Sequence, residues 1–233
     1  MKRAKARGLV IFIALQVAAL ACTPAAASLP PPSPTPTVAP TPTAVPTRTP
    51  AADATELRAA RDNLKAGRYT RHGFVPRITF AVNASWRAVQ VLGGFFDVQQ
   101  KVGSPDVIAV QFARPDGIYR APGDLVAPNS AQKAVDALGA NPSLTVVEAS
   151  ESRMDGLTGL QITVENPSTA AGDVPVMHVP PGPLGISPGR RLWIAFFDLP
   201  EGLVAVMIGG SVEKWDEALL AAEPVLESVT IGH

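Results

Sequence analysis

Two serines are each followed by a lysine three residues later, a spacing at which the lysine can take the serine proton during acyl transfer. The pairs are Ser130 with Lys133 and Ser211 with Lys214. Enzymes that use such a pair also need a Lys-Thr-Gly or Lys-Ser-Gly segment, which this chain lacks. Both serines precede amphipathic segments, where serine commonly caps a helix. We therefore interpret both as helix caps and expect no catalytic residue.

The histidines offer little metal chemistry. His72, His178 and His233 have no second ligand three or four residues away, which excludes a zinc site on a single helix. The glycine-rich nucleotide-binding motifs are also absent, and we expect no metal and no cofactor. The alternative left open is an envelope enzyme with a site assembled around residues 173–191. Its candidate groups are Asp173, His178 and Arg190.

A segment rich in proline and glycine, residues 178–191, is the first candidate binding region. Its composition predicts a long connection without regular structure, and such connections often carry function. Apolar side chains there could contact a ligand, and the two arginines could meet an anion. The alternative, which we favour, is a surface crossover that folds back on the sheet. The candidate binding residues are His178, Leu184, Ile186, Arg190 and Arg191.

The second candidate binding region is VLGGFFDVQQK, residues 91–101. Phe95 and Phe96 are adjacent, so in a strand they face opposite ways, and one of them could be exposed to a partner. Burial of both rings in the core, across a bend at Gly93 and Gly94, is the alternative that we favour.

The chain balances 20 basic against 20 acidic side chains, so no overall charge directs it to nucleic acid. The balance hides an asymmetry, because Lys2, Arg3, Lys5 and Arg7 precede the single cysteine and no acidic residue does. A basic start, an apolar run and small residues are typical of a secretory signal over residues 1–21. The apolar run is shorter than the roughly 20 residues that a membrane-spanning helix needs.

The only cysteine, Cys22, follows Ala19-Leu20-Ala21. This tetrapeptide resembles the bacterial lipobox, although Ala19 stands where leucine is usual. The resemblance implies that Cys22 becomes the lipidated first residue of the mature protein and anchors it to a membrane. The alternative is ordinary secretion with cleavage near residues 25–27, which would remove the cysteine. One cysteine excludes an internal disulfide and a cysteine-cluster metal site.

Three segments follow from composition. Residues 1–21 form the signal peptide, and residues 22–52 form the lipidated cysteine with a disordered linker rich in proline and threonine. The third segment, residues 53–233, has the length of one domain. It opens with a predicted helix over residues 54–66, where Asp53 and Glu56 have capping-box spacing.

Alternating apolar residues predict strands over residues 78–82 and 108–112, and a hairpin around Asp155-Gly156. Residues 192–197 and 203–208 are apolar on both faces, as in central strands joined by a tight turn. Two helices are expected, one capped by Asn129 or Ser130 and one capped by Ser211. The second helix carries an apolar stripe of Val212, Trp215, Leu219, Ala222 and Leu226 and is kinked or restarted at Pro224.

A short strand over residues 229–231 ends the chain. This order of hairpins with two inserted helices predicts an α+β fold, mainly an antiparallel sheet with helices packed on its faces. The segments GRYTRHGFVPRITFAVNASWRAV and VLESVTI are similar to those of exported bacterial lipoproteins with a PsbP-like domain, including the LpqN type. The resemblance covers roughly residues 67–232. It implies a sheet sandwiched between helices and a binding or scaffolding role, and it carries over no catalytic or metal-binding residue.

From the sequence we therefore expect an exported, surface-anchored lipoprotein whose extracytoplasmic domain binds a partner protein or an apolar ligand without catalysis. Its contact with the membrane is the N-terminal lipid anchor, and no nucleic acid partner is expected. Besides the envelope enzyme, a secreted and unlipidated structural domain is the remaining alternative.

Overall fold

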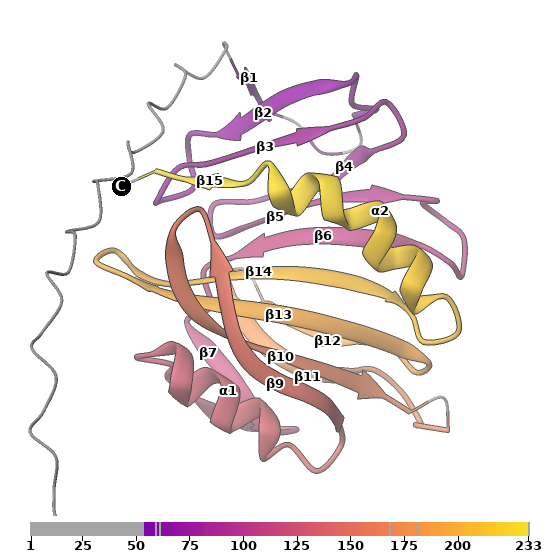
Figure 1. The fold of residues 1–233 in the computed structure, drawn as a ribbon. Coiled ribbons are helices and arrows are strands. Elements are labelled where there is room, and N and C mark those ends of the chain that lie inside the picture. Colours follow the sequence, from indigo (N-terminus) through magenta and orange to yellow (C-terminus); the bar gives the residue numbers. More distant parts are fainter. Residues whose placement is uncertain (1–53, 59, 61, 168, 181, 233) are drawn as a thin grey trace, which may run out of the picture. The chain divides into compact units, whose positions relative to one another are not determined.

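The computed structural model describes residues 54–232 except 59, 61, 168 and 181. The predictions for the signal peptide, for Cys22 and for the linker lie outside these residues. Three sheets and two helices build the described part (Figure 1). All described strand pairs but one are antiparallel, which confirms the predicted α+β class with a mainly antiparallel sheet.

The largest sheet has seven strands in the order β4-β5-β6-β14-β13-β10-β9. These strands are β4 (Arg87–Val91), β5 (Phe95–Gln100), β6 (Ile108–Ala113), β14 (Gly202–Ser211), β13 (Arg190–Leu199), β10 (Leu157–Asn166) and β9 (Thr145–Met154). The predicted hairpin at Asp155-Gly156 is confirmed, because both residues adopt positive φ angles of 51° and 80° between β9 and β10. A two-residue turn of this kind matches the twist of the flanking strands.

Two four-stranded sheets flank the large one. The first has the order β1-β2-β3-β15 and contains β1 (Thr55–Glu56), β2 (Gly67–Arg71), β3 (Ile78–Val82) and β15 (Thr230–Ile231). The second has the order β12-β11-β7-β8 and contains β12 (Gly182–Ile186), β11 (Val174–Val179), β7 (Gly117–Ala121) and β8 (Asp124–Val126). The helices are α1 (Ala131–Gly139) and α2 (Trp215–Glu227).

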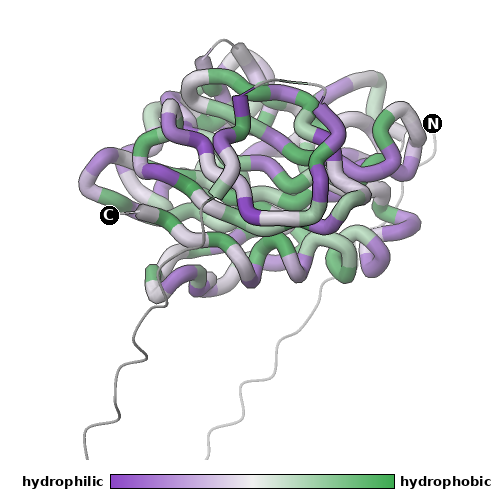
Figure 2. The backbone as a smooth tube through the Cα atoms, turned by 90° about the horizontal axis from the view of Figure 1, so that it is seen from above, coloured by the Kyte–Doolittle hydropathy of each residue, from purple (hydrophilic) through white to green (hydrophobic). Residues whose placement is uncertain are grey.

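The strands β13 and β14 are central and buried on both faces, as predicted. On β14, Val204 and Val206 point into one hydrophobic core with α2, while Ala205 and Met207 point into the other with α1. Side chains of a strand alternate between the faces of a sheet, so a run that is apolar throughout needs a cover on each side. Figure 2 shows hydrophobic and hydrophilic residues following one another along the outer segments of the backbone.

The predicted helix over residues 54–66 is wrong. The described residues there form β1 and a backbone bridge between Asn63 and Arg87. Glu56 does not cap a helix, because its carboxylate accepts hydrogen bonds from the backbone N–H of His72 and the guanidinium of Arg71. Pairing with neighbouring strands therefore satisfies the backbone that a helix would have used.

Helix α1 begins as predicted: the Ser130 hydroxyl accepts a 3.2 Å hydrogen bond from the Lys133 backbone N–H. The predicted cap of α2 is wrong, since Ser211 is the last residue of β14 and the helix begins after Lys214. The helix runs through Pro224 to Glu227 without a restart. Its buried stripe is also rotated from the predicted one and consists of Trp215, Ala218, Ala222 and Val225.

Residues 178–191 are not a connection without regular structure, which corrects the prediction. They hold the end of β11, all of β12 and the start of β13. Pro183 lies on β12, an edge strand, which is where sheets tolerate proline. The register of β11 against β12 shifts between Pro175 and Met177, which accommodates the second proline. The preferred prediction, that the apolar residues fold back on a sheet, is confirmed for Ile186.

Candidate functional site

A groove of about 840 Å³ lies between α2 and the β9–β10 hairpin. Helix α2 packs across β14, β6 and β3 and leaves the same face of β10 and β9 without a helix above it (Figure 1). The groove occupies this uncovered area. Its volume lies within the roughly 300–1,000 Å³ of typical ligand pockets.

The floor of the groove comes from neighbouring strands. Trp193 on β13 lies directly opposite Ile208 on β14, and Gln161 on β10 is beside them. Met154 closes the end next to the β9–β10 turn. The indole of Trp193 is only partly buried, whereas the other two tryptophans of the chain, Trp86 and Trp215, are 1% and 8% exposed. A ligand in the groove would therefore contact one tryptophan.

The helical wall of the groove exposes apolar side chains. Leu219 is 37% exposed and Leu220 is 71% exposed, and Leu226 is partly buried below them. A leucine that is exposed alone needs no explanation, but several around one hollow mark a binding surface. The sequence carried a signal for this wall. The four consecutive apolar residues Leu219-Leu220-Ala221-Ala222 point to more than one side of a helix, so one sheet cannot cover all of them.

Helix α2 is fixed at both ends, which gives the groove a defined shape. Gly210 lets it approach β14 closely, since a Cβ there would lie 2.7 Å from the Cβ of Ala218. The Ser228 hydroxyl after the helix accepts a 2.7 Å hydrogen bond from the Ala81 backbone N–H on β3. Before the helix, the Lys214 ammonium donates to the carboxylate of Asp106, and this bond lowers the pKa of Asp106 and raises that of Lys214.

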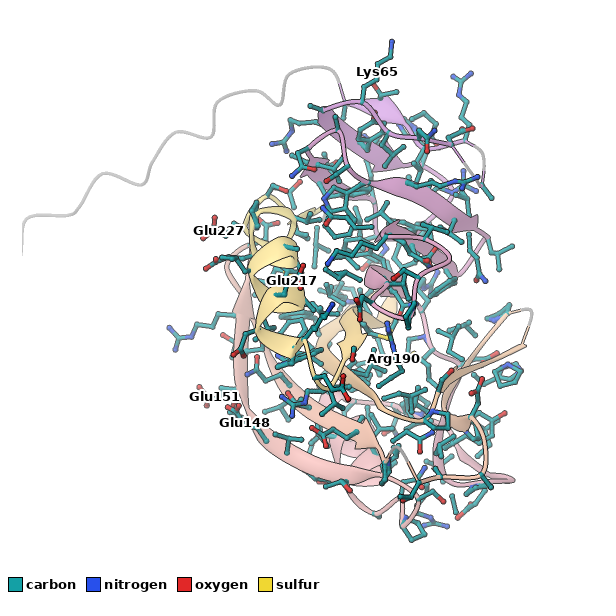
Figure 3. The ribbon with its side chains drawn as sticks, turned by 90° about the vertical axis from the view of Figure 1, so that its right-hand side faces the viewer. Lys65, Glu148, Glu151, Arg190, Glu217 and Glu227 are labelled. Carbon is teal, nitrogen blue, oxygen red and sulfur yellow. The ribbon has the colours of Figure 1, made fainter. Side chains whose placement is uncertain are left out.

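The rim of the groove is acidic. Glu151 lies on the β9 side, and Glu223 and Glu227 lie on the α2 side. Figure 3 shows Glu151 and Glu227 on the same side of the molecule, together with Glu148. Arg153 is the one basic residue that lines this groove. The groove therefore combines an apolar interior with a net negative border.

None of the seven residues predicted for binding lines this groove. Phe95 and Phe96 are 1% and 0% exposed and point into different cores, so burial of both is confirmed. Phe95 and Leu184 also line a smaller hollow of about 490 Å³. Leu184 is partly buried, and Ile186 is buried against the core on the α1 side. These four side chains contribute to packing.

The two predicted arginines make internal contacts. The Arg190 guanidinium donates to the backbone carbonyls of Pro105 and Val107, and burial lowers its pKa. The Arg191 guanidinium pairs with the Glu165 carboxylate and lies 5.3 Å from the centre of the Trp215 ring. Both arginines thus hold the large sheet against neighbouring elements.

The residues of the enzyme alternative are not joined in one site. The His178 imidazole contacts the Asp116 carboxylate through Nδ1 at 2.6 Å, and Arg190 makes the carbonyl contacts described above. Asp173 is exposed and has no hydrogen bond or ion pair with either of them. In the part of the chain that the structure covers, no group of three or more His, Cys, Asp or Glu side chains is placed to hold a metal ion.

The same part of the chain contains no helix that is both long and apolar enough to span a membrane.

One buried carboxylate lies far from the groove along the sheet. Asp97 on β5 is 1% exposed and accepts hydrogen bonds from the Gln90 backbone N–H at 2.6 Å and from the Gln99 amide at 2.5 Å. Desolvation by burial raises the pKa of Asp97, and these hydrogen bonds oppose the rise. Its neighbours are amides rather than a nucleophile or a base, so its geometry offers no catalytic pair.

Comparison with known proteins gives distant similarities. No protein-family model matches the chain, and no curated protein matches it. The solved structures that it is similar to include cyanobacterial PsbP (CyanoP) from Synechocystis sp. PCC 6803, with 14% identity, 78% of this chain and 99% of that chain covered, and a TM-score of 0.39. They also include LpqN, involved in cell envelope biogenesis of Mycobacterium tuberculosis, with 10% identity, 72% and 86% covered, and a TM-score of 0.39.

A PsbP protein and LpqN, the two types named from the sequence, are thus both among the similar structures. The fold class of this chain stands on its own sheets and helices.

Proposed function

We propose that this protein is an exported bacterial lipoprotein, anchored through Cys22, whose domain binds an apolar ligand or an apolar segment of a partner protein without catalysing a reaction. The observation that carries the binding role is the groove between α2 and the β9–β10 hairpin. It exposes leucines on one wall and a partly buried tryptophan on its floor.

The fixed position of α2 supports this role. A groove whose walls are held by hydrogen bonds and ion pairs at both ends of the helix needs little rearrangement to accept a ligand, which lowers the entropic cost of binding. The apolar surface available in it supplies about 25 cal/mol for each Å² that a ligand covers. Burial of apolar surface in this groove therefore accounts for ligand binding without a catalysed reaction.

The binding role is tested with N-phenyl-1-naphthylamine, an uncharged apolar probe that fluoresces when it leaves water. We expect the purified protein to bind it saturably and to quench Trp193, with the quenching lost in Trp193→Phe. The double variant Leu219→Ser/Leu220→Ser should weaken binding several-fold, because both leucines line the groove. Val102→Ser is the matched control, since Val102 is 42% exposed but lies outside the groove.

A protein that does not bind the probe, or that binds it equally well after both leucines are replaced, contradicts the binding proposal. The anchor is tested separately by labelling cells with a radioactive fatty acid. We expect the label on the wild-type protein and none on Cys22→Ala. An unlabelled wild-type protein would favour the secreted alternative.

A further inference from the structure

The charges around the groove indicate which kind of partner it accepts. Asp155 also lines the groove, but its carboxylate accepts a hydrogen bond from the Ile231 backbone N–H. Three further carboxylates border the groove, those of Glu151, Glu223 and Glu227, against one guanidinium, that of Arg153. None of these four groups has a hydrogen bond or an ion pair with another described residue. Elsewhere on the molecule several exposed or half-buried carboxylates do have a cationic partner. These are Asp106 with Lys214, Asp124 with Arg120, Glu165 with Arg191 and Glu217 with Lys101.

The three carboxylates are separated in space. Glu223 and Glu227 are four residues apart on α2, which is a rise of about 6 Å along the helix. Glu151 belongs to the strand on the opposite side of the groove. A ligand that meets all three must therefore carry several positive charges on both sides of an apolar strip.

This distribution favours a polypeptide over other occupants. A small amphiphile with one cationic head can meet only one of the separated carboxylates. An anionic lipid surface and the same groove of a second copy would both bring like charges together. The strand β9 also ends the seven-stranded sheet, and no described strand pairs with its outer side. Its free backbone groups could bind another polypeptide chain.

We propose that the groove binds a basic amphipathic segment of a partner protein. This inference rests on the proposed binding role of the same groove. The apolar side chains of the segment cover Trp193, Leu219 and Leu220, and its lysines or arginines pair with the carboxylates on the rim. Exposed rim pairs of this kind contribute modestly to affinity and strongly to partner choice and association rate.

The test uses two short synthetic peptides with identical leucine positions, one with lysine and one with glutamate at the remaining charged positions. Fluorescence anisotropy measures their binding to the purified protein at low salt and near physiological salt. We expect the lysine peptide to bind at least about tenfold more tightly, which is the combined effect of three exposed ion pairs of ordinary strength. The preference should shrink as salt is added.

The triple variant Glu151→Gln/Glu223→Gln/Glu227→Gln should lose most of this preference and still bind N-phenyl-1-naphthylamine as the wild type does. Its matched control is Asp173→Asn/Glu201→Gln/Glu213→Gln, which changes the net charge equally with exposed residues outside the groove. The control should keep the preference. Retained binding of the uncharged probe shows that the triple variant is folded.

Three results would overturn the inference while leaving the binding role in place, because the uncharged probe still binds. In the first, the two peptides bind equally well. In the second, the control variant loses the preference for the lysine peptide as much as the rim variant does. In the third, dodecyltrimethylammonium displaces the lysine peptide as effectively as unlabelled lysine peptide does, which would indicate a small cationic amphiphile. Failure of the uncharged probe and of both peptides would instead remove the binding role itself.

Discussion

The two ends of the seven-stranded sheet differ in how completely they are covered. At the β4–β5 end, Phe95 and Phe96 are buried on opposite faces. The outer edge of β4 is closed by hydrogen bonds from Leu64 to Trp86 and from Ala88 to Asp62. At the β9 end, residues 145–151 are all exposed and the edge carries no described strand.

This difference separates stability from binding within one sheet. The closed end removes aromatic surface from water on both faces, which is the main favourable contribution to folding. The open end leaves apolar side chains and backbone groups available, and its charged residues on β9 protect the edge from unspecific pairing. Substitutions at the closed end should therefore change the free energy of unfolding, whereas substitutions at the open end should change binding.

The largest effect is expected for Phe96→Ala at the closed end. The Phe96 ring lies 4.7 Å from Phe112 and 5.3 Å from Phe74, between ring centres, and it is fully buried. Its removal leaves a cavity and should lower the free energy of unfolding by about 3–5 kcal/mol. Urea denaturation measures the loss, with Leu220→Ala on the α2 wall of the groove beside the open end as the control. Equal losses in the two variants would show that the ends do not differ.

A smaller loss is expected for Gly210→Ala, which tests the helical wall between the two ends. A Cβ at this position would meet the Cβ of Ala218 at 2.7 Å, so α2 must move away from β14. Overpacking of this kind costs about 1–3 kcal/mol. Because the groove depends on the position of α2, probe affinity should fall together with stability. Unchanged probe affinity in a destabilised variant would show that the wall does not define the groove.

The closed end should also show a specific pH dependence through Asp97. Burial raises the pKa of Asp97 in the folded state, so the folded protein holds this proton at pH values where the unfolded chain has released it. Its contribution to stability is therefore complete below about pH 4 and is lost as pH rises through the folded-state pKa, by at most about 1.4 kcal/mol per pH unit.

Asp97→Asn removes this titration. The free energy of unfolding of the variant, measured in urea between pH 4 and pH 8, should rise relative to the wild type as pH increases. Parallel curves for the two proteins would mean that the carboxyl titrates alike in the folded and unfolded states.

The smallest effect is expected for Val147→Thr at the open end. Val147 is 48% exposed and lies at the register shift between β9 and β10. Surface substitutions away from packing contacts change stability by less than about 0.5 kcal/mol. Thermal unfolding provides the measurement. A loss as large as that of a core substitution would show that β9 is covered and that the two ends are alike.

Local chemistry explains the predictions that are confirmed. Asp155-Gly156 can adopt the positive φ angles of a tight hairpin turn. Residues 192–197 and 203–208 present apolar side chains on both faces of a strand, whatever the position of that strand in the fold. Ser130 caps α1 through a bond within its own turn. Each of these features depends on neighbours in sequence.

The failed predictions depend on partners that are distant in sequence. Residues 54–66 have helical spacing, but the backbone N–H groups of Leu57 and Leu64 donate to the carbonyls of Thr70 on β2 and of Trp86 just before β4. Proline and glycine in residues 178–191 indicated an irregular connection, whereas an edge strand tolerates them.

By itself, the sequence determined the α+β class, the hairpins β9–β10 and β13–β14, and the absence of familiar catalytic motifs. Only the tertiary structure decided where the candidate site lies. The spacing of Trp215, Leu219 and Leu226 shows that they lie near one face of a helix, but it does not show which strands this helix crosses. Because α2 crosses β14 and β6 and leaves β10 and β9 bare, leucines of an apparent core stripe become the wall of a groove.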